Sequence, residues 1–571
     1  MVKVISRIAI IAGLCAAGAA WCGHVREATG TRGTEHSKVE VVFFNGNIYT
    51  LDSAKPVVEA LSAGGGRIIE TGSSRELLTH LAPGTPAIDL RGRTVIPGLT
   101  DAHAHFLGFA QACAWLDFGG TSSLEDVVAL VAARVGSEQR EAWILGRGWD
   151  QNDWRQARYP GKAELDSVAP GNPVYLVRVC GHAAYANSRA LLLAGVTKTT
   201  PDPAGGKIVR DGTGEPTGIL IEDAMDLVAK HIPPLTREEK KELLVAAAKK
   251  CLASGLVGVH EMGISGEDVS LYREMFSERA LPFRITAYLS SGDPERERLL
   301  NEKLLRGFAD DHFSIVGVKF LADGSLGARS AALLSDYSDD PGNRGILLKD
   351  AEWLYREMLR CHEKGFQVAV HAIGDAAVRE VLDIYERMLS EHPSPDMRHR
   401  IEHAQVVSPR DVPRFATLGV IPSMQFTHCT SDMPWAEARL GPERIRGAYA
   451  WRSLVRAGSR IPGGSDFPVE SIRPLLGIYA AVTRRDVAGK PDGGWLSEQC
   501  LTVDEAVRAF TIDAAYAAHA EREAGTLTPG KLADCIVISD DIFSVRPADI
   551  PKIEILATIL GGEIVHRSNA F

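Results

Sequence analysis

The stretch Val95-Ile96-Pro97-Gly98-Leu99-Thr100-Asp101-Ala102-His103-Ala104-His105 decides the fold of this chain. An apolar run passes a Pro-Gly corner and ends on a His-x-His pair. In a β-strand, residues i and i+2 point to the same face, so His103 and His105 can present two imidazoles to one metal ion. Alone, such a pair is weak evidence, because it also occurs on protein surfaces. Strand-like runs downstream, each ending in a His or Asp, strengthen the interpretation of this pair as metal ligands.

The middle of the chain alternates short apolar runs with segments of helical spacing, as a (β/α) barrel does. Val368-Ala369-Val370-His371 is one such strand, the apolar positions of 378–389 have helical spacing, and Arg400-Ile401-Glu402-His403 is the next strand. One βα unit therefore separates His371 from His403. In such barrels the residues at the carboxyl ends of the strands face the active site, and every candidate side chain lies at such an end.

Short strand-like runs at both ends of the chain predict a small β-domain built from both termini. A long interruption follows His105, and we interpret it as an insertion at the barrel mouth. The expected class is α/β: a distorted (β/α)8 TIM-like barrel with a small β-sandwich domain formed from both chain ends and an inserted segment at the barrel mouth. The expected bounds are 38–94 and 516–571 for the two parts of the sandwich, 95–515 for the barrel and about 106–218 for the insertion.

The first residues predict export. Lys3 and Arg7 precede the apolar run 8–20, which is too short to cross a bilayer comfortably. We expect a removed signal peptide over 1–22 and a flexible tether over 23–37, hence a periplasmic or extracellular protein with no stable membrane span. A cytoplasmic protein is the alternative if the leader does not function.

Composition bounds the class of partner. The chain has 571 residues and a net charge of -10, and its 45% hydrophobic and 24% charged residues are typical of a globular protein. An acidic balance without a long basic run disfavours nucleic-acid binding. A small-molecule substrate is therefore the expected partner, and no nucleic acid.

The strand-end residues supply four imidazoles and one carboxylate, the ligand types that zinc and similar divalent ions take. Lys319 lies in the apolar run 315–321, whose expected burial is costly for an unpaired ammonium. Reaction with CO2 would make it an anionic carbamate able to bridge two metals. An ordinary salt-bridged lysine is the alternative, and Glu261, which also ends a strand, is a competing bridge. The predicted metal ligands are His103, His105, Lys319, His371, His403 and Asp466.

Taken together, these motifs resemble the amidohydrolase superfamily, and within it the YtcJ-like group that includes N-substituted formamide deformylases. The resemblance implies a distorted TIM barrel beside a β-sandwich, with His103 and His105 at the more buried metal and His371 and His403 at the second. Lys319 would be the carboxylated bridge, and Asp466 would contact the metal and handle protons. The chain departs from the pattern in carrying Glu261 where relatives often have Asp. The matching segments are 95–105, 148–150, 181–182, 187–191, 318–325, 370–375, 401–405, 464–468 and 525–534.

The predicted reaction is hydrolysis of a non-peptide C–N bond in an N-acyl, formamide or cyclic amide substrate. It uses one or two divalent ions, with zinc favoured: metal-held hydroxide attacks a carbonyl that the metal polarises together with His182, and Asp466 passes the proton to the leaving nitrogen. His182 is equally well explained as a packing residue of the insertion. Two alternatives stay open: an ester, lactone or carbamate hydrolase using the same site, and a metal-bound binding protein without turnover.

Overall fold

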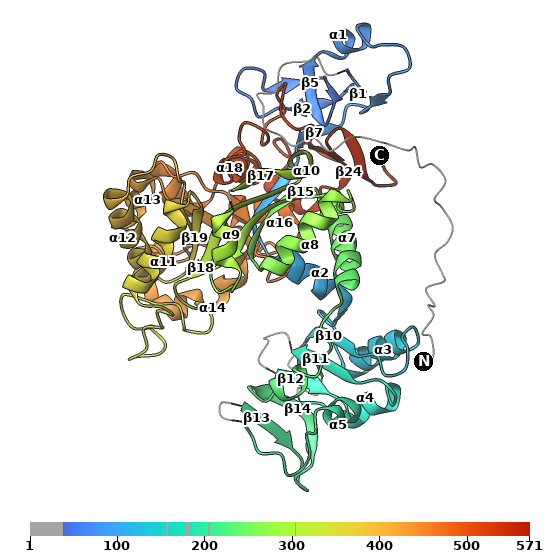
Figure 1. Cartoon of the computed structure of the whole chain (residues 1–571), viewed down its shortest axis with the longest axis vertical. Helices are drawn as coiled ribbons and strands as arrows, with labels where there is room; N and C mark the ends of the chain where they lie inside the picture. The colour runs from blue at the N-terminus through green and yellow to red at the C-terminus, as the bar shows by residue number, and fades with distance from the viewer. Residues whose placement is uncertain (1–37, 152–153, 156–157, 179–182, 204–205, 303) are drawn as a thin grey trace. The chain divides into compact units, whose positions relative to one another are not determined.

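The structure is a computed structural model that describes residues 38–151, 154–155, 158–178, 183–203, 206–302 and 304–571 (Figure 1). The expected signal peptide and tether, and His182, lie outside the described residues. Among the described helices, none combines the length and apolar character that a bilayer span needs.

The predicted (β/α) barrel is confirmed as a nearly closed sheet of eight parallel strands. Parallel neighbours require crossover connections, and the alternation of strands and helices supplies them. The last strand is only two residues long and does not pair with the first by a ladder. Instead, Ser465 Oγ donates to Asp101 Oδ2 at 2.6 Å and Asp466 N donates to the His103 carbonyl at 2.8 Å. In spatial order the strands are β22 (Gly463–Gly464), β21 (Ile421–Gln425), β20 (Arg400–His403), β19 (Gln367–Ala372), β18 (Phe313–Leu321), β16 (Arg284–Ser290), β15 (Leu256–Ile264) and β8 (Leu99–Ala104), with β17 (Leu305–Gly307) paired to β18.

Helices connect these strands and bury one face against them. The helical spacing over 378–389 lies within α12 (Asp375–Glu391), where Val378, Val381, Leu382 and Tyr385 are buried. The other helices of the barrel are α2 (Phe106–Ala114), α7 (Arg237–Ala253), α8 (Gly266–Ser277), α9 (Arg296–Asn301), α10 (Phe308–Asp311), α11 (Ala351–Glu363), α13 (Val412–Leu418), α14 (Phe426–Arg444), α15 (Trp451–Arg456), α16 (Pro474–Thr483), α17 (Val503–Ala509) and α18 (Ile512–Ala517).

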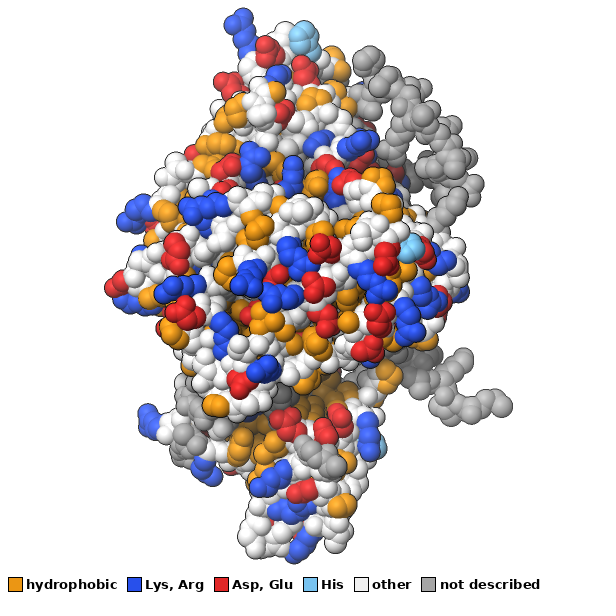
Figure 2. All heavy atoms as spheres, turned by 90° about the vertical axis from the view of Figure 1, so that its left-hand side faces the viewer, with side chains coloured by type: hydrophobic (Ala, Val, Ile, Leu, Met, Phe, Trp, Pro, Cys, Tyr) orange, Lys and Arg blue, Asp and Glu red, His pale blue; other side chains and the backbone are white. Residues whose placement is uncertain are grey.

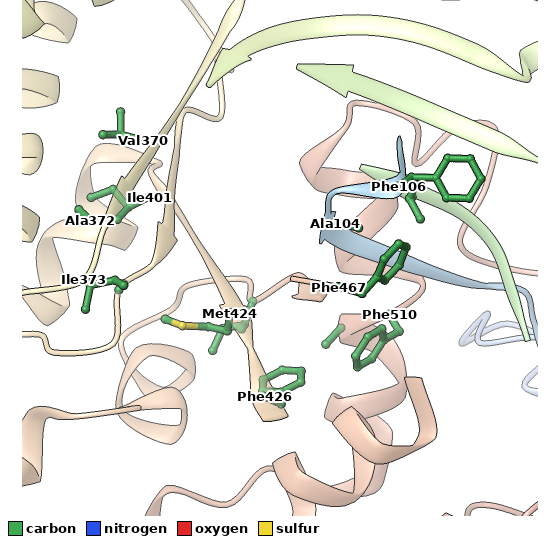
Figure 3. Packing of buried hydrophobic residues seen from close by; sticks show 14 of the residues in the cluster. Ala104, Phe106, Val370, Ala372, Ile373, Ile401, Met424, Phe426, Phe467 and Phe510 are labelled. Atoms are coloured by element: carbon green, nitrogen blue, oxygen red, sulfur yellow. The ribbon is translucent and has the colours of Figure 1, made fainter. Parts of the chain in front are cut away.

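The apolar core of the barrel leaves the polar strand-end residues on the inner face. In β19, Val370 and Ala372 belong to the hydrophobic core, so the alternation of a strand puts His371 on the opposite face. Figure 3 shows these side chains beside Ile401 of β20, with Met424 at β21. This packing holds the carboxyl ends of neighbouring strands together.

Both chain ends contribute to one sheet, as the sequence predicts. In β7 (Thr94–Pro97), Val95 pairs in parallel with Ile48 and antiparallel with Val537, so early and late segments lie side by side (Figure 1). Gly98 separates β7 from β8, and a Cβ there would meet Val257 at 2.5 Å. The decisive stretch therefore spans two sheets. The six-stranded sheet has the order β25 (Glu563–Arg567), β24 (Ile555–Leu560), β23 (Cys535–Ile538), β7, β2 (Asn47–Tyr49), β3 (Val57–Val58). A four-stranded sheet has the order β5 (Arg67–Gly72), β4 (Ala60–Gly64), β1 (Val41–Phe44), β6 (Ala87–Asp89), and α1 (Ser74–Thr79) follows β5.

A third sheet lies between β8 and α7 in the sequence and has hydrophobic clusters of its own, one of them around Trp149 and Tyr185. The segment that forms this sheet begins after α2, because α2 itself belongs to the barrel: its Phe106 and Ala110 pack in the barrel core. Its strand order is β13 (Gly206–Arg210), β14 (Pro216–Glu222), β12 (Ala183–Ala186), β11 (Val174–Arg178), β10 (Ile144–Trp149), β9 (Leu116–Asp117), and its helices are α3 (Leu124–Val135), α4 (Lys162–Val168), α5 (Ser188–Leu193) and α6 (Asp226–Ala229).

Charged side chains are mixed on the molecular face that Figure 2 shows. Lys and Arg alternate with Asp and Glu across it, without the single-sign stripe that typifies a nucleic-acid footprint.

Candidate metal centre

The His-x-His pair and Asp466 converge, although the sequence separates them widely. His103 Nε2 lies 3.5 Å and His105 Nε2 3.2 Å from Asp466 Oδ1. His105 is the N-cap residue of α2, and Glu261 of β15 accepts the backbone N–H groups of Phe106 and, at 3.1 Å, Leu107. This carboxylate satisfies the free donors at the start of the helix and so fixes the direction in which the chain leaves β8.

His403 reaches the same place from β20. Its ring centroid lies 4.7 Å from that of His103 and 4.6 Å from that of His371. His403 and Asp466 both have left-handed backbones, with φ of 74° and 63°. Non-glycine residues rarely adopt this conformation, and where they do it commonly serves a site. Here it turns two strand ends so that their side chains face the centre.

The histidines of the centre are oriented by acceptors outside it. A neutral imidazole that donates Nδ1–H keeps the lone pair of Nε2 free, which is the form that binds a metal. Three rings are held in this way: His103 donates to Glu402 Oε2 at 2.6 Å, His105 to the Met262 carbonyl at 3.0 Å, and His403 to Gln425 Oε1 at 2.7 Å.

The donor set fits a divalent cation. His103 Nε2, His428 Nε2 and Asp466 Oδ1 are buried and have no hydrogen-bond partner among the described residues. Such orphaned atoms are costly unless a ligand satisfies them. Imidazole nitrogens around a carboxylate are the ligands that zinc and related ions take. Two groups share Asp466, each with its ligand atoms within 4.8 Å of one another: His103, His105, Asp466 and His403, His428, Asp466.

Lys319 is buried at this centre, with 7% of its surface exposed. No carboxylate among the described residues forms an ion pair with it, and its Nζ has no hydrogen-bond partner there. Burial lowers the pKa of Lys319 to about 8, although the charges of Glu402 and Asp466 raise it. The competing bridge, Glu261, instead uses both carboxylate oxygens to cap α2.

His371 lies beside His403 but outside both of these groups. Its Nε2 is 3.3 Å from the Gly324 carbonyl and 3.5 Å from Asp323 Oδ1. The structure thus brings four of the predicted ligands, His103, His105, Lys319 and His403, to Asp466 or its immediate neighbours. His371 lies on the far side of His403. The role of His182 stays a prediction.

Two functional features escape sequence reasoning. Glu402 is fully buried and accepts a hydrogen bond from Arg400 Nε at 2.7 Å. Arg400 lies two residues before Glu402 in β20, so both side chains are on the same face of that strand. Arg400 is in turn fixed by the Ala102 carbonyl and Ser423 Oγ at 2.7 and 2.8 Å. An alternating pair of buried opposite charges in a strand is the signal that could have identified Glu402. The second feature is His428, which lies three residues past the end of β21 and in the first turn of α14, whereas His103, His371 and His403 lie within their strands.

The charge states of the centre suit metal binding. Burial, helped by the Lys319 charge, lowers the pKa of His103 to about 4, so the ring is neutral at neutral pH. Burial alone would raise the pKa of Asp466, but the neighbouring imidazoles of His105 and His103 hold it well below its usual value. Asp466 is therefore an anion among neutral imidazoles.

Comparison with known proteins supports a metal-binding centre in this chain. Residues 87–566 match the amidohydrolase family. The chain is 35% identical over 538 residues to a putative amidohydrolase, YtcJ, of Bacillus subtilis, covering 93% of this chain and all of that one. It is 28% identical to an N-substituted formamide deformylase of Arthrobacter pascens, covering 92% of this chain and 97% of that one. An uncharacterized metal-dependent hydrolase from Pyrococcus furiosus has the same fold, with a TM-score of 0.73, 30% identity and coverage of 88% and 100%.

Proposed function

This chain belongs to the amidohydrolase family, and on that premise we propose that it hydrolyses a carbon–nitrogen bond other than a peptide bond in a small amide. The observation that carries the proposal is the convergence of imidazoles on Asp466: an acceptor orients each of His103, His105 and His403 from behind, and His103 Nε2 is buried without a hydrogen-bond partner among the described residues. A bound divalent ion would lower the pKa of water to about 7 and polarise a carbonyl. His103, His105, His403 and Asp466 would hold it.

Asp466 is the proton carrier of the proposed reaction. Its carboxylate is ionised, and its Oδ1 lies between His103 and His105. It accepts a proton from the attacking water as the carbon–oxygen bond forms. It then delivers that proton to the departing nitrogen as the carbon–nitrogen bond breaks, acting first as general base and then as general acid.

The choice of an amide over an ester is supported by the relative named as a formamide deformylase. The decisive experiment is a panel of paired substrates that differ only in the leaving atom: N-benzylformamide against benzyl formate, and N-acetyl against O-acetyl analogues. We expect turnover of the amides that Asp466→Asn abolishes. Turnover of esters alone would establish the ester hydrolase alternative, and no turnover with metal bound would favour a binding protein.

The number of ions is the second part of the proposal. We propose that Lys319, buried without a partner, is carboxylated and bridges two ions, with zinc favoured. Metal analysis of the wild type should give about two equivalents, and Lys319→Ala one or none. One equivalent in both proteins would make Lys319 a structural lysine.

We further propose that the protein is exported, on the strength of Lys3, Arg7 and the apolar run 8–20. Fractionation of a bacterial host and N-terminal sequencing would test it. Protein that stays in the cytoplasm with residues 1–22 intact would contradict it.

A further inference from the structure

His428 differs from the other histidines of the centre in what lies behind its ring. It is in the first turn of α14, and 8% of its surface is exposed. Its Nε2 faces Asp466 Oδ2 at 3.8 Å, too far for a hydrogen bond, and has no partner among the described residues. The ring is therefore aimed at the centre with one nitrogen unused.

The other nitrogen of His428 accepts a hydrogen bond. Gln405 Nε2 lies 3.1 Å from His428 Nδ1, and an amide nitrogen can only donate. A neutral imidazole whose Nδ1 accepts must carry its proton on Nε2. His103, His105 and His403 have the opposite arrangement, because a carboxylate or carbonyl oxygen accepts their Nδ1–H.

We propose that His428 is a catalytic hydrogen-bond donor of the centre and not a metal ligand. An Nε2 that carries a proton has no lone pair for an ion, but it can donate to the carbonyl oxygen of a small amide. That oxygen gains negative charge as water adds to the carbon, so the bond from His428 strengthens in the transition state. The inference rests on the proposed function and assigns a residue that binds the substrate oxygen.

The tautomer can be read directly. Long-range proton–nitrogen NMR correlations of ¹⁵N-histidine-labelled, zinc-loaded protein would distinguish Nδ1–H from Nε2–H, and His428→Gln would assign its resonance by difference. We expect Nε2–H at His428 and Nδ1–H at His103 and His403. Finding Nδ1–H at His428 would overturn the proposal.

Metal content and kinetics give a second, independent test. His428→Phe should keep the zinc content of the wild type, whereas His403→Gln should lose zinc. Removing a donor of this kind slows catalysis by about 100- to 1000-fold, so kcat on N-benzylformamide should fall by that factor in His428→Phe. His428→Gln, which restores an N–H donor in a side chain that fits the site, should recover part of the loss.

The outcomes separate this inference from the proposed function. If His428→Phe loses zinc as His403→Gln does, while both melt as folded proteins, His428 is a ligand and the inference is wrong. If zinc stays and kcat does not change, His428 does not contact the reacting oxygen, and the inference is again wrong. If the wild type hydrolyses no amide, the proposed function fails, and the NMR result still decides the tautomer.

Discussion

At the residue scale, the buried pair of Arg400 and Glu402 connects folding to the centre. Glu402 accepts from Arg400 at 2.7 Å and from His103 at 2.6 Å, and both charged side chains are fully buried. Burial would raise the pKa of Glu402, but the charge of Arg400 beside it keeps that pKa well below the usual range. One carboxylate thus neutralises a buried cation and orients a ligand.

Glu402→Gln should therefore lower both the free energy of unfolding and the affinity for the metal. Removing one partner of a buried ion pair costs about 3–5 kcal/mol, and losing the group behind a ligand lowers metal affinity about 10- to 100-fold. Denaturant unfolding and zinc titration would measure the two effects. The matched control is Glu352→Gln, whose pair with Arg387 is largely exposed (70% and 44%) and should contribute less than about 1 kcal/mol. Equal losses in both variants would contradict the argument.

The loss of metal binding at low pH should follow the protonation of His105. Burial lowers the pKa of His105, but the adjacent Asp466 carboxylate raises it more, so the pKa of His105 lies above the usual 6.5. Protons compete with the ion for the ring, so binding is lost as the pH falls through this raised pKa. His103, with a pKa of about 4, stays neutral over the same range. Zinc titrations from about pH 8 to about pH 3.5 would locate the midpoint. A midpoint near the pKa of His103 would refute this assignment.

At the element scale, closure of the barrel depends on the approach of β22 to β8. A Cβ on Gly464 would lie 2.7 Å from Asp101 Oδ1 and 2.7 Å from the backbone nitrogen of His103. These groups cannot move away, because Asp101 holds Ser465 and His103 through its carboxylate. The short strand thus positions Asp466 two residues further on.

Gly464→Ala should destabilise the protein by about 1–3 kcal/mol and weaken zinc binding, because overpacking would push Asp466 away from the histidines. Thermal unfolding and zinc titration would measure both. Gly212→Ala is the control: a Cβ there meets nothing within 4 Å, so the change should stay within about 0.5 kcal/mol. A Gly464→Ala protein with unchanged zinc affinity would show that closure does not position Asp466.

At the scale of the whole molecule, the two chain ends depend on each other. Val537 of β23 is fully buried in a cluster that contains Phe43 and Leu61 from the other end of the chain. Val537→Asp would bury an unpaired carboxylate there and should cost about 3 kcal/mol or more.

Thermal melting would test this dependence, with Val487→Asp as the control. Val487 is 81% exposed, so its replacement should change the stability by less than about 0.5 kcal/mol. We expect the first variant alone to lose folded protein at physiological temperature. Comparable melting temperatures would mean that the paired ends contribute little to stability.

The sequence by itself determined the barrel, the strand-end positions and the pairing of the chain ends. These depend on local sequence patterns: the apolar run of β19, helical spacing in α12 and a Pro-Gly corner before β8 can each be recognised within about ten residues. The places of His103, His371 and His403 were predictable for the same reason, since a residue at the end of a parallel strand faces a common edge.

Only the tertiary structure decided the hydrogen-bond partners of the histidine rings, the sharing of Asp466 and the place of His428. Glu402 is 299 positions from the ring it orients, and Asp466 approaches His103 and His105 across the closure of the barrel. A hydrogen-bond partner supplied by another strand leaves no trace in local periodicity. The physical reason is that a strand pattern determines the face on which a side chain lies, whereas packing determines which atom it meets there.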